Sequence, residues 1–379
     1  MTTTTGTTGT TTTTALEPTA LDPTPLSASE AAAAQQFAGR MLGVLNDAAV
    51  ALLTSTGHQT GLLATMGGLP AATSEQVADA AGLEERYVRE WLGGMTAAGV
   101  VRYDAASGTY LLPREHAAVL TPAAGPDNLA VLMQHVAMMG EVEQRTIARF
   151  RDGGGLSYAD YPTFHRNMAE TSAAVHDAAL VDGILPLAPD LPAVLRAGAD
   201  AADVGCGRGH AVNLMARAFP ASRFTGYDSS AAAIDAARAE AAAMGLTNAA
   251  FEVRDVATLD VHEAYDLVTA FDAVHDQARP AAVLEAVRRA LRPGGTFLMV
   301  DIQASSHLEQ NLALPWGAYL YAISTYHCMS VSLGQGGAGL GTVWGVERAA
   351  AMLAEAGFGH VEQQQVAADP FNAYFVARR

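Results

Sequence analysis

Glycine recurs at alternate positions in one short stretch of the chain, between Asp203 and His210, which reads Asp-Val-Gly-Cys-Gly-Arg-Gly-His. An apolar run, residues 197–202, precedes this stretch, and apolar residues at helical spacing follow it. The pattern predicts a strand, a tight turn and a helix, and glycines let the backbone of such a turn approach a ligand closely. Asp228 ends the next predicted strand, nineteen residues after Gly209. A carboxylate near this spacing meets ribose hydroxyls in a Rossmann-type site.

The turn fits one class of cofactor better than another. A dinucleotide-binding fingerprint needs its third glycine where this chain has His210, which disfavours a dinucleotide. The Asp-x-Gly-x-Gly-x-Gly form resembles motif I of class I methyltransferases that use S-adenosylmethionine (SAM). Later segments resemble the successive motifs of that family, at residues 253–256, 265–271 and 291–295. The resemblance implies SAM as the cofactor and an α/β fold, with a Rossmann-like seven-stranded sheet whose last strand is antiparallel.

The resemblance also implies which residues surround SAM. The glycine turn would hold the methionine part, Asp228 the ribose, and Asp255 and Val256 the adenine. Asp255 has a second interpretation, as the cap of the turn that follows it. The cofactor residues implied in this way are Asp203, Gly205, Gly207, Gly209, Asp228, Ser229, Asp255, Val256 and Phe271.

Composition excludes several other classes of function. The formal net charge is −17, and nucleic-acid binding relies on basic patches, so we expect no nucleic-acid partner. With two cysteines, and histidines scattered without a carboxylate or cysteine at ligand spacing, we expect no metal site. No uninterrupted apolar run is long enough to cross a bilayer, and the N-terminus lacks the features of a signal peptide. We therefore expect a cytoplasmic protein with no membrane partner.

Changes of pattern along the chain predict its domain organisation. The N-terminal segment is rich in threonine and has almost nothing to bury. The predicted parts are a disordered tail (1–30), a winged-helix dimerisation domain (31–120), a helical connector that contributes to the substrate pocket (121–185) and a SAM-binding methyltransferase domain (186–379).

The winged-helix prediction rests on two short helices, residues 74–82 and 84–93, followed by two short strands at 100–103 and 109–112. In the second helix we expect the core-facing side chains to be Tyr87, Val88, Trp91 and Leu92. The surface of that helix has no basic excess, so dimerisation is favoured over DNA binding. Small-molecule O-methyltransferases of the plant and antibiotic-pathway type have such an N-terminal domain. This chain resembles them, which implies a homodimer and a small-molecule methyl acceptor.

The catalytic residues are expected just past the strand at 265–271. His275 and Asp276 resemble the His-Asp pair of the plant enzymes, whose histidine is the general base, and an imidazole with an ordinary pKa suits that role. Asp276 would cap or orient, and Asp301 at the end of the next strand would orient His275. A second orienting glutamate of the plant enzymes is absent from residues 342–345. The alternative is that His275 only bonds to the backbone.

The substrate pocket is predicted from aromatic residues beside a glycine-rich segment, residues 312–341, and from the connector. The residues expected there are His135, Met139, Tyr326, His327 and Asn372, with the two histidines as reserve candidates for the base. O-methylation of a small molecule, such as a secondary metabolite, is the favoured reaction. N-methylation of an amine, a SAM-sensing regulator and SAM binding without methyl transfer remain open.

Overall fold

A computed structural model describes residues 24–379, which form two compact units divided after Asp47. Helix α1 (Ala28–Gln59) runs through this division. Ser27 caps the helix, because its hydroxyl accepts a hydrogen bond from the Glu30 N–H at 3.3 Å. Most of the predicted disordered tail, residues 1–23, lies outside the described residues, and the tail's last three residues are helical.

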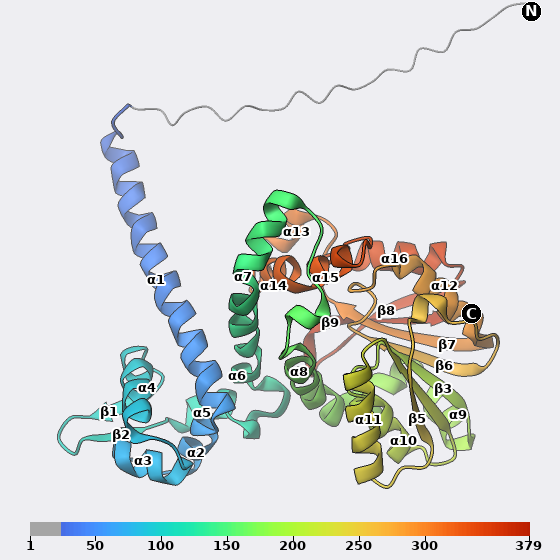
Figure 1. Cartoon of the computed structure of the whole chain (residues 1–379), viewed down its shortest axis with the longest axis horizontal. Coiled ribbons are helices and arrows are strands. Elements are labelled where there is room, and N and C mark those ends of the chain that lie inside the picture. The colour runs from blue at the N-terminus through green and yellow to red at the C-terminus, as the bar shows by residue number, and fades with distance from the viewer. Residues whose placement is uncertain (1–23) are drawn as a thin grey trace, which may run out of the picture. The chain divides into compact units, whose positions relative to one another are not determined.

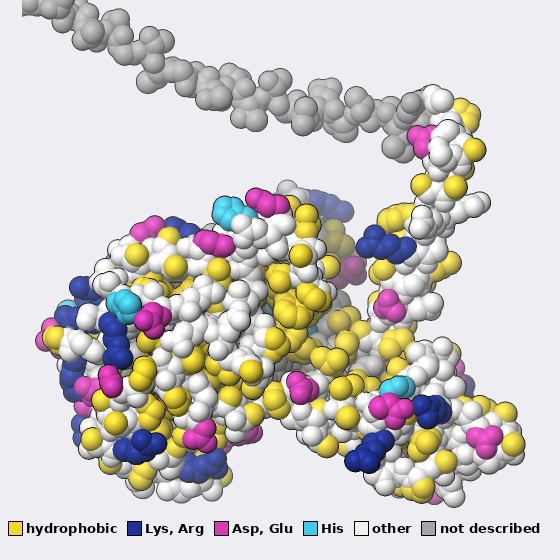
Figure 2. Space-filling view, turned by 180° about the vertical axis from the view of Figure 1, so that it is seen from behind, with side chains coloured by type: hydrophobic (Ala, Val, Ile, Leu, Met, Phe, Trp, Pro, Cys, Tyr) yellow, Lys and Arg dark blue, Asp and Glu magenta, His cyan; other side chains and the backbone are white. Residues whose placement is uncertain are grey.

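The first unit consists of the N-terminal part of α1, whose apolar side chains are exposed. Phe37, Met41, Leu42 and Leu45 are 47–67 % exposed, and Figure 2 shows apolar side chains along this segment. Among the described residues, α1 is the single unbent helix long and apolar enough to cross a membrane, with 6 % of its apolar window buried. An apolar face of this kind needs a partner surface or a lipid environment.

The second unit begins with the predicted winged helix. Thr73 caps α3 through a capping box with Gln76, and Gly82 ends the helix in a left-handed conformation with φ +67°. The side chains of Val88, Trp91 and Leu92 face the core as predicted, but Tyr87 is 82 % exposed, because the helix turns it away from that face. The elements are α2 (Leu62–Gly68), α3 (Ser74–Ala81), α4 (Glu85–Ala97), β1 (Arg102–Asp104), β2 (Thr109–Leu111) and α5 (Arg114–Leu120).

The exposed face of α4 carries charges that pair with one another. Arg89 bonds to Glu85 at 2.6 Å, and Arg86 bonds to Glu90 at 2.5 Å. Each guanidinium of this helix therefore already has a carboxylate partner, which leaves little positive charge for a phosphate backbone.

A helical connector follows the winged helix. Its long helices pack with the segment around residue 330 through the side chains of Met138, Val142, Tyr161 and Val331. The connector is thus packed against the C-terminal domain. Its elements are η1 (Pro122–Asp127), α6 (Leu129–Leu132), α7 (Gln134–Asp152), η2 (Tyr158–Asp160), α8 (Phe164–Ala179), η3 (Leu180–Ile184) and η4 (Leu185–Leu187).

The C-terminal domain is built on a seven-stranded sheet in the order β5-β4-β3-β6-β7-β9-β8 (Figure 1). The pairings among β3 to β7 are parallel, and β9 pairs antiparallel with both β7 and β8. This confirms the predicted fold class. The strands are β3 (Asp200–Val204), β4 (Arg223–Asp228), β5 (Ala249–Val253), β6 (Tyr265–Phe271), β7 (Leu291–Ile302), β8 (His360–Val366) and β9 (Asp369–Arg378).

Helices cover both faces of this sheet (Figure 1), and each face has its own apolar core. Val212 and Ile234 belong to one core, and Leu284 and Leu353 belong to the other. The burial of both faces explains the nearly continuous apolar sequence of the central strands. The helices are α9 (Leu191–Ala197), α10 (His210–Ala218), α11 (Ala231–Ala243), η5 (Val256–Thr258), α12 (Pro280–Ala290), α13 (Leu308–Asn311), α14 (Gly317–Ile323), η6 (Ser324–Cys328), α15 (Met329–Gly334) and α16 (Val346–Glu355).

Candidate active site

The glycine turn lies between β3 and α10, at the carboxyl end of the parallel strands. Two of its glycines are required by their surroundings. Gly205 and Gly209 have φ values of +72° and +77°. A Cβ on Gly205 would lie 2.5 Å from that of Ala273, and a Cβ on Gly209 would lie 2.5 Å from side-chain atoms of Ala237 and Phe251. The turn therefore packs tightly against the domain on one side.

The middle of the turn is open and faces a carboxylate. A Cβ on Gly207 would meet no atom of residues 24–379 within 4 Å, although the φ of Gly207 is +53°. The Gly207 N–H donates to Asp228 Oδ2 at 2.9 Å, and the Ser230 N–H donates to Oδ1 at 2.8 Å. This open cradle beside an acidic side chain fits the methionine and ribose parts of SAM. SAM supplies a methyl group on a positively charged sulfur, and the residues of this turn would hold it.

Two alanine substitutions in the turn should have different effects. Gly209→Ala should lower the free energy of unfolding by about 2–4 kcal/mol, because a left-handed conformation and a packing clash act together. Gly207→Ala should lower the free energy of unfolding by only about 1–2 kcal/mol, the cost of the left-handed conformation, but its added methyl group would enter the cradle. We expect Gly207→Ala to weaken SAM binding more than it lowers stability. Denaturant unfolding and calorimetry with SAM would measure both effects, and an equal stability loss in the two variants would contradict this description.

Asp203 lies beneath the turn. The side chain is 3 % exposed, and its carboxylate accepts a hydrogen bond from the Thr269 hydroxyl at 2.7 Å. Burial raises the pKa of Asp203 to about 7, although the Thr269 hydrogen bond opposes the shift. Asp203 thus joins β3 to β6 below the turn, rather than presenting a charge to solvent.

The remaining cofactor residues lie along the same edge of the sheet. Ser229 is exposed directly after Asp228, Val256 is buried, and Phe271 packs against the ring of His176 at 4.7 Å. Asp255 caps η5 by accepting from the Ala257 N–H, which is the alternative interpretation. Its carboxylate also bonds to Arg279 at 2.7 Å. The adenine role of Asp255 stays a prediction.

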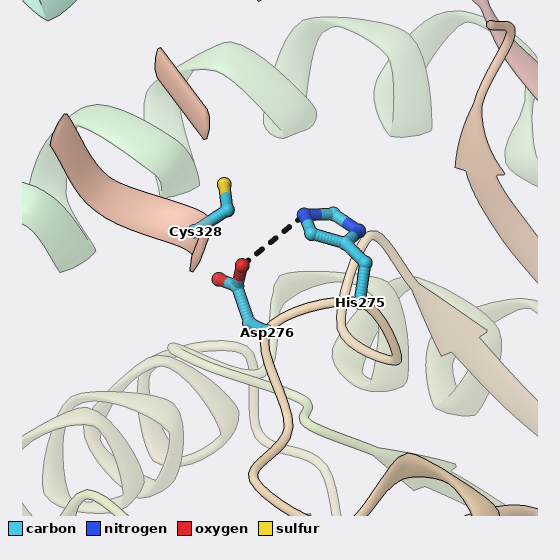
Figure 3. Close-up of side chains that lie close together, drawn as sticks. All are labelled: His275, Asp276 and Cys328. Carbon is cyan, nitrogen blue, oxygen red and sulfur yellow. Dashed lines mark ion pairs between the residues drawn. The ribbon is translucent and has the colours of Figure 1, made fainter. Parts of the chain in front are cut away.

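His275 lies in the loop after β6, between two carboxylates. Its Nδ1 is 2.8 Å from Asp301 Oδ1, and its Nε2 is 3.2 Å from Asp276 Oδ1. The three side chains are at most 8 % exposed. Figure 3 shows His275 and Asp276 facing each other, with the Cys328 side chain of η6 beside them. The structure therefore brings together the three predicted catalytic residues.

The two carboxylates change the titration of the histidine. Burial opposes the charged form, but Asp301 and Asp276 outweigh it and raise the pKa of His275 well above 6.5. The expectation of an imidazole with an ordinary pKa is therefore wrong for this site. Burial by itself would raise the pKa of Asp276, but the charge and hydrogen bond of His275 lower it to about 2. At neutral pH the pair is mainly ionic.

Trp344 is a residue of the site that the sequence analysis did not predict. Its indole Nε1–H donates to Asp301 Oδ1 at 2.9 Å, and the Ile302 N–H donates to the same oxygen at 2.8 Å. These two donors fix the carboxylate that bonds to His275. Trp344 belongs to residues 342–345, the segment that lacks the second orienting glutamate of the plant enzymes. This chain therefore has an indole N–H donor in the segment where those enzymes have a carboxylate. Glu347, in the first turn of α16, accepts from the Ser305 hydroxyl and the Ser306 N–H.

His275, Asp276 and Cys328 also offer ligand atoms within 4.8 Å of one another, so they are the group among the described residues that could hold a metal ion. Folding brings the Cys328 thiol beside the adjacent pair His275 and Asp276, which the position of Cys328 in the sequence did not indicate. Burial raises the pKa of the Cys328 thiol to about 11, so the thiol keeps its proton at neutral pH.

The predicted pocket residues lie in two places. His135 is buried, and its Nδ1 bonds to the Tyr319 hydroxyl at 2.6 Å, while Met139 and Tyr326 pack against the connector core. Burial lowers the pKa of His135 to about 4. Asn372 on β9 donates to Asp272, at the start of the His275 loop, at 3.2 Å and to Asp369 at 2.9 Å.

Comparison with known proteins agrees with this geometry. Residues 48–122 match the family described as the Rv2258c-like winged HTH domain, and residues 195–365 match a methyltransferase domain. The mitomycin 7-O-methyltransferase MmcR is 17 % identical, with a TM-score of 0.67, and the match covers 93 % of this chain and 99 % of MmcR. Human N-acetylserotonin methyltransferase in complex with SAM is 16 % identical, with a TM-score of 0.63 and coverage of 90 % and 97 %.

A candidate O-methyltransferase from Nostoc punctiforme is 16 % identical, with a TM-score of 0.68 and coverage of 90 % of this chain and 98 % of that one. At these identities the likeness establishes the fold across nearly the whole of each relative. Together with the two domain matches and the glycine cradle facing Asp228, it shows that this chain is a SAM-dependent methyltransferase with an N-terminal winged-helix domain.

Proposed function

We propose that this enzyme transfers the methyl group of SAM to a hydroxyl of a small molecule, with His275 as the general base. The observation that carries the proposal is the buried chain in which Asp301 holds His275 Nδ1 at 2.8 Å. In the neutral imidazole the Nδ1 proton is then committed to Asp301, and the lone pair is on Nε2. A hydroxyl is a weak nucleophile until its proton begins to leave, so a base fixed in this way has a defined task.

The residues divide the work as follows. Bound SAM would supply the methyl group and leave as S-adenosylhomocysteine, and His275 Nε2 would accept the proton of the hydroxyl that takes the methyl group. The imidazolium that forms is stabilised by Asp301 on one side and Asp276 on the other, which lie 2.8 and 3.2 Å away. Burial of the site excludes water and strengthens these interactions. Orientation of the two reactants in such a pocket supplies much of the rate enhancement.

A methyl-transfer screen tests the proposal. Aromatic and polyketide-like alcohols, acids and amines would be incubated with SAM and read by the mass gain of one methylene. We expect the product to carry a methyl ether. Transfer to amines alone, with His275→Gln unimpaired, would favour the N-methyltransferase. Transfer to none, combined with SAM-dependent binding of DNA at low salt, would favour the regulator.

We also propose that the enzyme is a homodimer through its N-terminal domain. The exposed apolar side chains of α1, including Leu42 at 64 % and Leu45 at 67 %, support this assignment. By light scattering we expect twice the 39.3 kDa of one chain. The double variant Leu42→Asp and Leu45→Asp should elute as a monomer at micromolar concentration. A monomeric parent protein, or a parent that floats with anionic vesicles, would contradict the proposal.

A further inference from the structure

His327 is a buried histidine without a hydrogen-bond partner, beside the proposed catalytic pair. The residue is 0 % exposed, and neither ring nitrogen has a hydrogen-bond partner among the described residues. An unpaired polar atom in a protein interior is destabilising, so a substrate group that bonds to one of these nitrogens would relieve that cost. The residue lies in η6, a π-helical turn, and such turns are frequent at functional sites.

The position of His327 relates it to the reacting centre. Its Nδ1 is 3.8 Å from Asp276 Oδ2, too far for a hydrogen bond, and Asp276 in turn contacts His275. A substrate group that reaches His327 therefore lies next to a hydroxyl that reaches His275. The two histidines approach the same carboxylate, one through each of its oxygens.

Aromatic rings surround His327. Phe164 stacks on the imidazole with ring centroids 3.9 Å apart, and Tyr161 and Tyr158 meet it edge-on at 4.7 and 5.7 Å. Burial lowers the pKa of His327 to about 4, so the ring is neutral and offers one donor and one acceptor nitrogen. Neither nitrogen reaches solvent, so a substrate must displace some of these aromatic side chains to bond to His327. A flat aromatic substrate is best suited to replace the ring contacts that are lost.

We propose that His327 recognises a second polar group on the methyl acceptor, and that the acceptor is an aromatic compound with this group adjacent to the reacting hydroxyl. The inference rests on the proposed O-methylation and assigns its substrate class. A vicinal diol or a hydroxy-carbonyl compound has the required arrangement. One oxygen is then methylated, and the other pairs with an imidazole nitrogen of His327.

A matched pair of probes tests this inference without methyl transfer. The enzyme saturated with S-adenosylhomocysteine would be titrated by calorimetry with 2,3-dihydroxynaphthalene and with 2-naphthol, which differ by one hydroxyl. We expect the diol to bind about 10- to 100-fold more tightly, because 2-naphthol leaves His327 unpaired. In His327→Phe, which keeps the stacking on Phe164, the two probes should bind alike. His327→Asn, which keeps a donor and an acceptor, should restore part of the difference.

Equal binding of the two probes to the parent enzyme would overturn the inference, as would a preference that His327→Phe leaves intact. Absence of binding by both probes would overturn the aromatic assignment. Comparison of His327→Phe with the parent enzyme assigns the preference to His327, and His327→Asn is a second variant for the case in which His327→Phe is unstable. A preference for the diol without any methyl transfer would instead count against the proposed O-methylation, so the two failures are distinguishable.

Discussion

Replacement of His275 by glutamine is expected to lower kcat for methyl transfer to a hydroxyl by about 10²- to 10⁴-fold, the range that general bases contribute. Glutamine can still bond to Asp301 but cannot accept the substrate proton. Because His275 bonds to Asp301 and Asp276, whereas the cradle bond joins Gly207 to Asp228, SAM binding should stay within about threefold. Initial rates at saturating SAM, with calorimetry for the cofactor, would separate the two effects.

Cys328→Ser is the matched control for this prediction. It alters the same buried cluster, but the thiol keeps its proton at neutral pH, so its loss should reduce kcat by less than about tenfold. If His275→Gln costs no more than Cys328→Ser, His275 orients rather than reacts. The alternative in which His275 bonds only to the backbone is already contradicted by the structure, because its Nδ1 bonds to the Asp301 carboxylate.

Replacement of Asp228 by asparagine should have the second large effect, on SAM binding rather than on kcat. Hydrogen bonds to a charged group contribute about 1.5–3 kcal/mol, which corresponds to about 10- to 100-fold in the dissociation constant. The Asp228 carboxylate also accepts the Gly207 and Ser230 N–H groups, so the substitution loosens the cradle as well. Calorimetry with SAM would give the change in affinity directly.

Asp255→Asn serves as the comparison for Asp228→Asn. Its carboxylate is 51 % exposed and pairs with Arg279, so the capping interpretation expects SAM affinity to change by less than about threefold. A loss as large as that of Asp228→Asn would instead favour the adenine role. If Asp228→Asn itself leaves SAM affinity unchanged, the ribose assignment is wrong.

The part of the site that lies close together in the sequence could be predicted from it. The glycine turn and Asp228 follow a local spacing rule, because a strand, a turn and a helix fix their positions relative to one another. The fold class followed from the same pattern. His275 and Asp301 came from the resemblance to plant enzymes, and the structure confirms that the two side chains meet at 2.8 Å.

The contacts that only folding creates could not be predicted. Trp344 reaches Asp301 across 43 residues, and a tryptophan in a loop carries no local sign of an N–H directed at a carboxylate. The raised pKa of His275 depends on two carboxylates, one of them 26 residues away, so an ordinary value was the natural expectation. Tyr87 was predicted to face the core but is exposed, because the sequence pattern does not show where the apolar face of the helix ends.

The pH dependence of kcat/KM tests the central claim, that His275 between Asp301 and Asp276 is the base. The base must be neutral to accept a proton, and although burial opposes charge, the two carboxylates raise the pKa of His275 well above 6.5. We expect kcat/KM to rise about tenfold per pH unit through neutrality, to level off well above pH 6.5, and to lose this dependence in His275→Gln. A profile already level at pH 6.5, or one that His275→Gln shares, would contradict it.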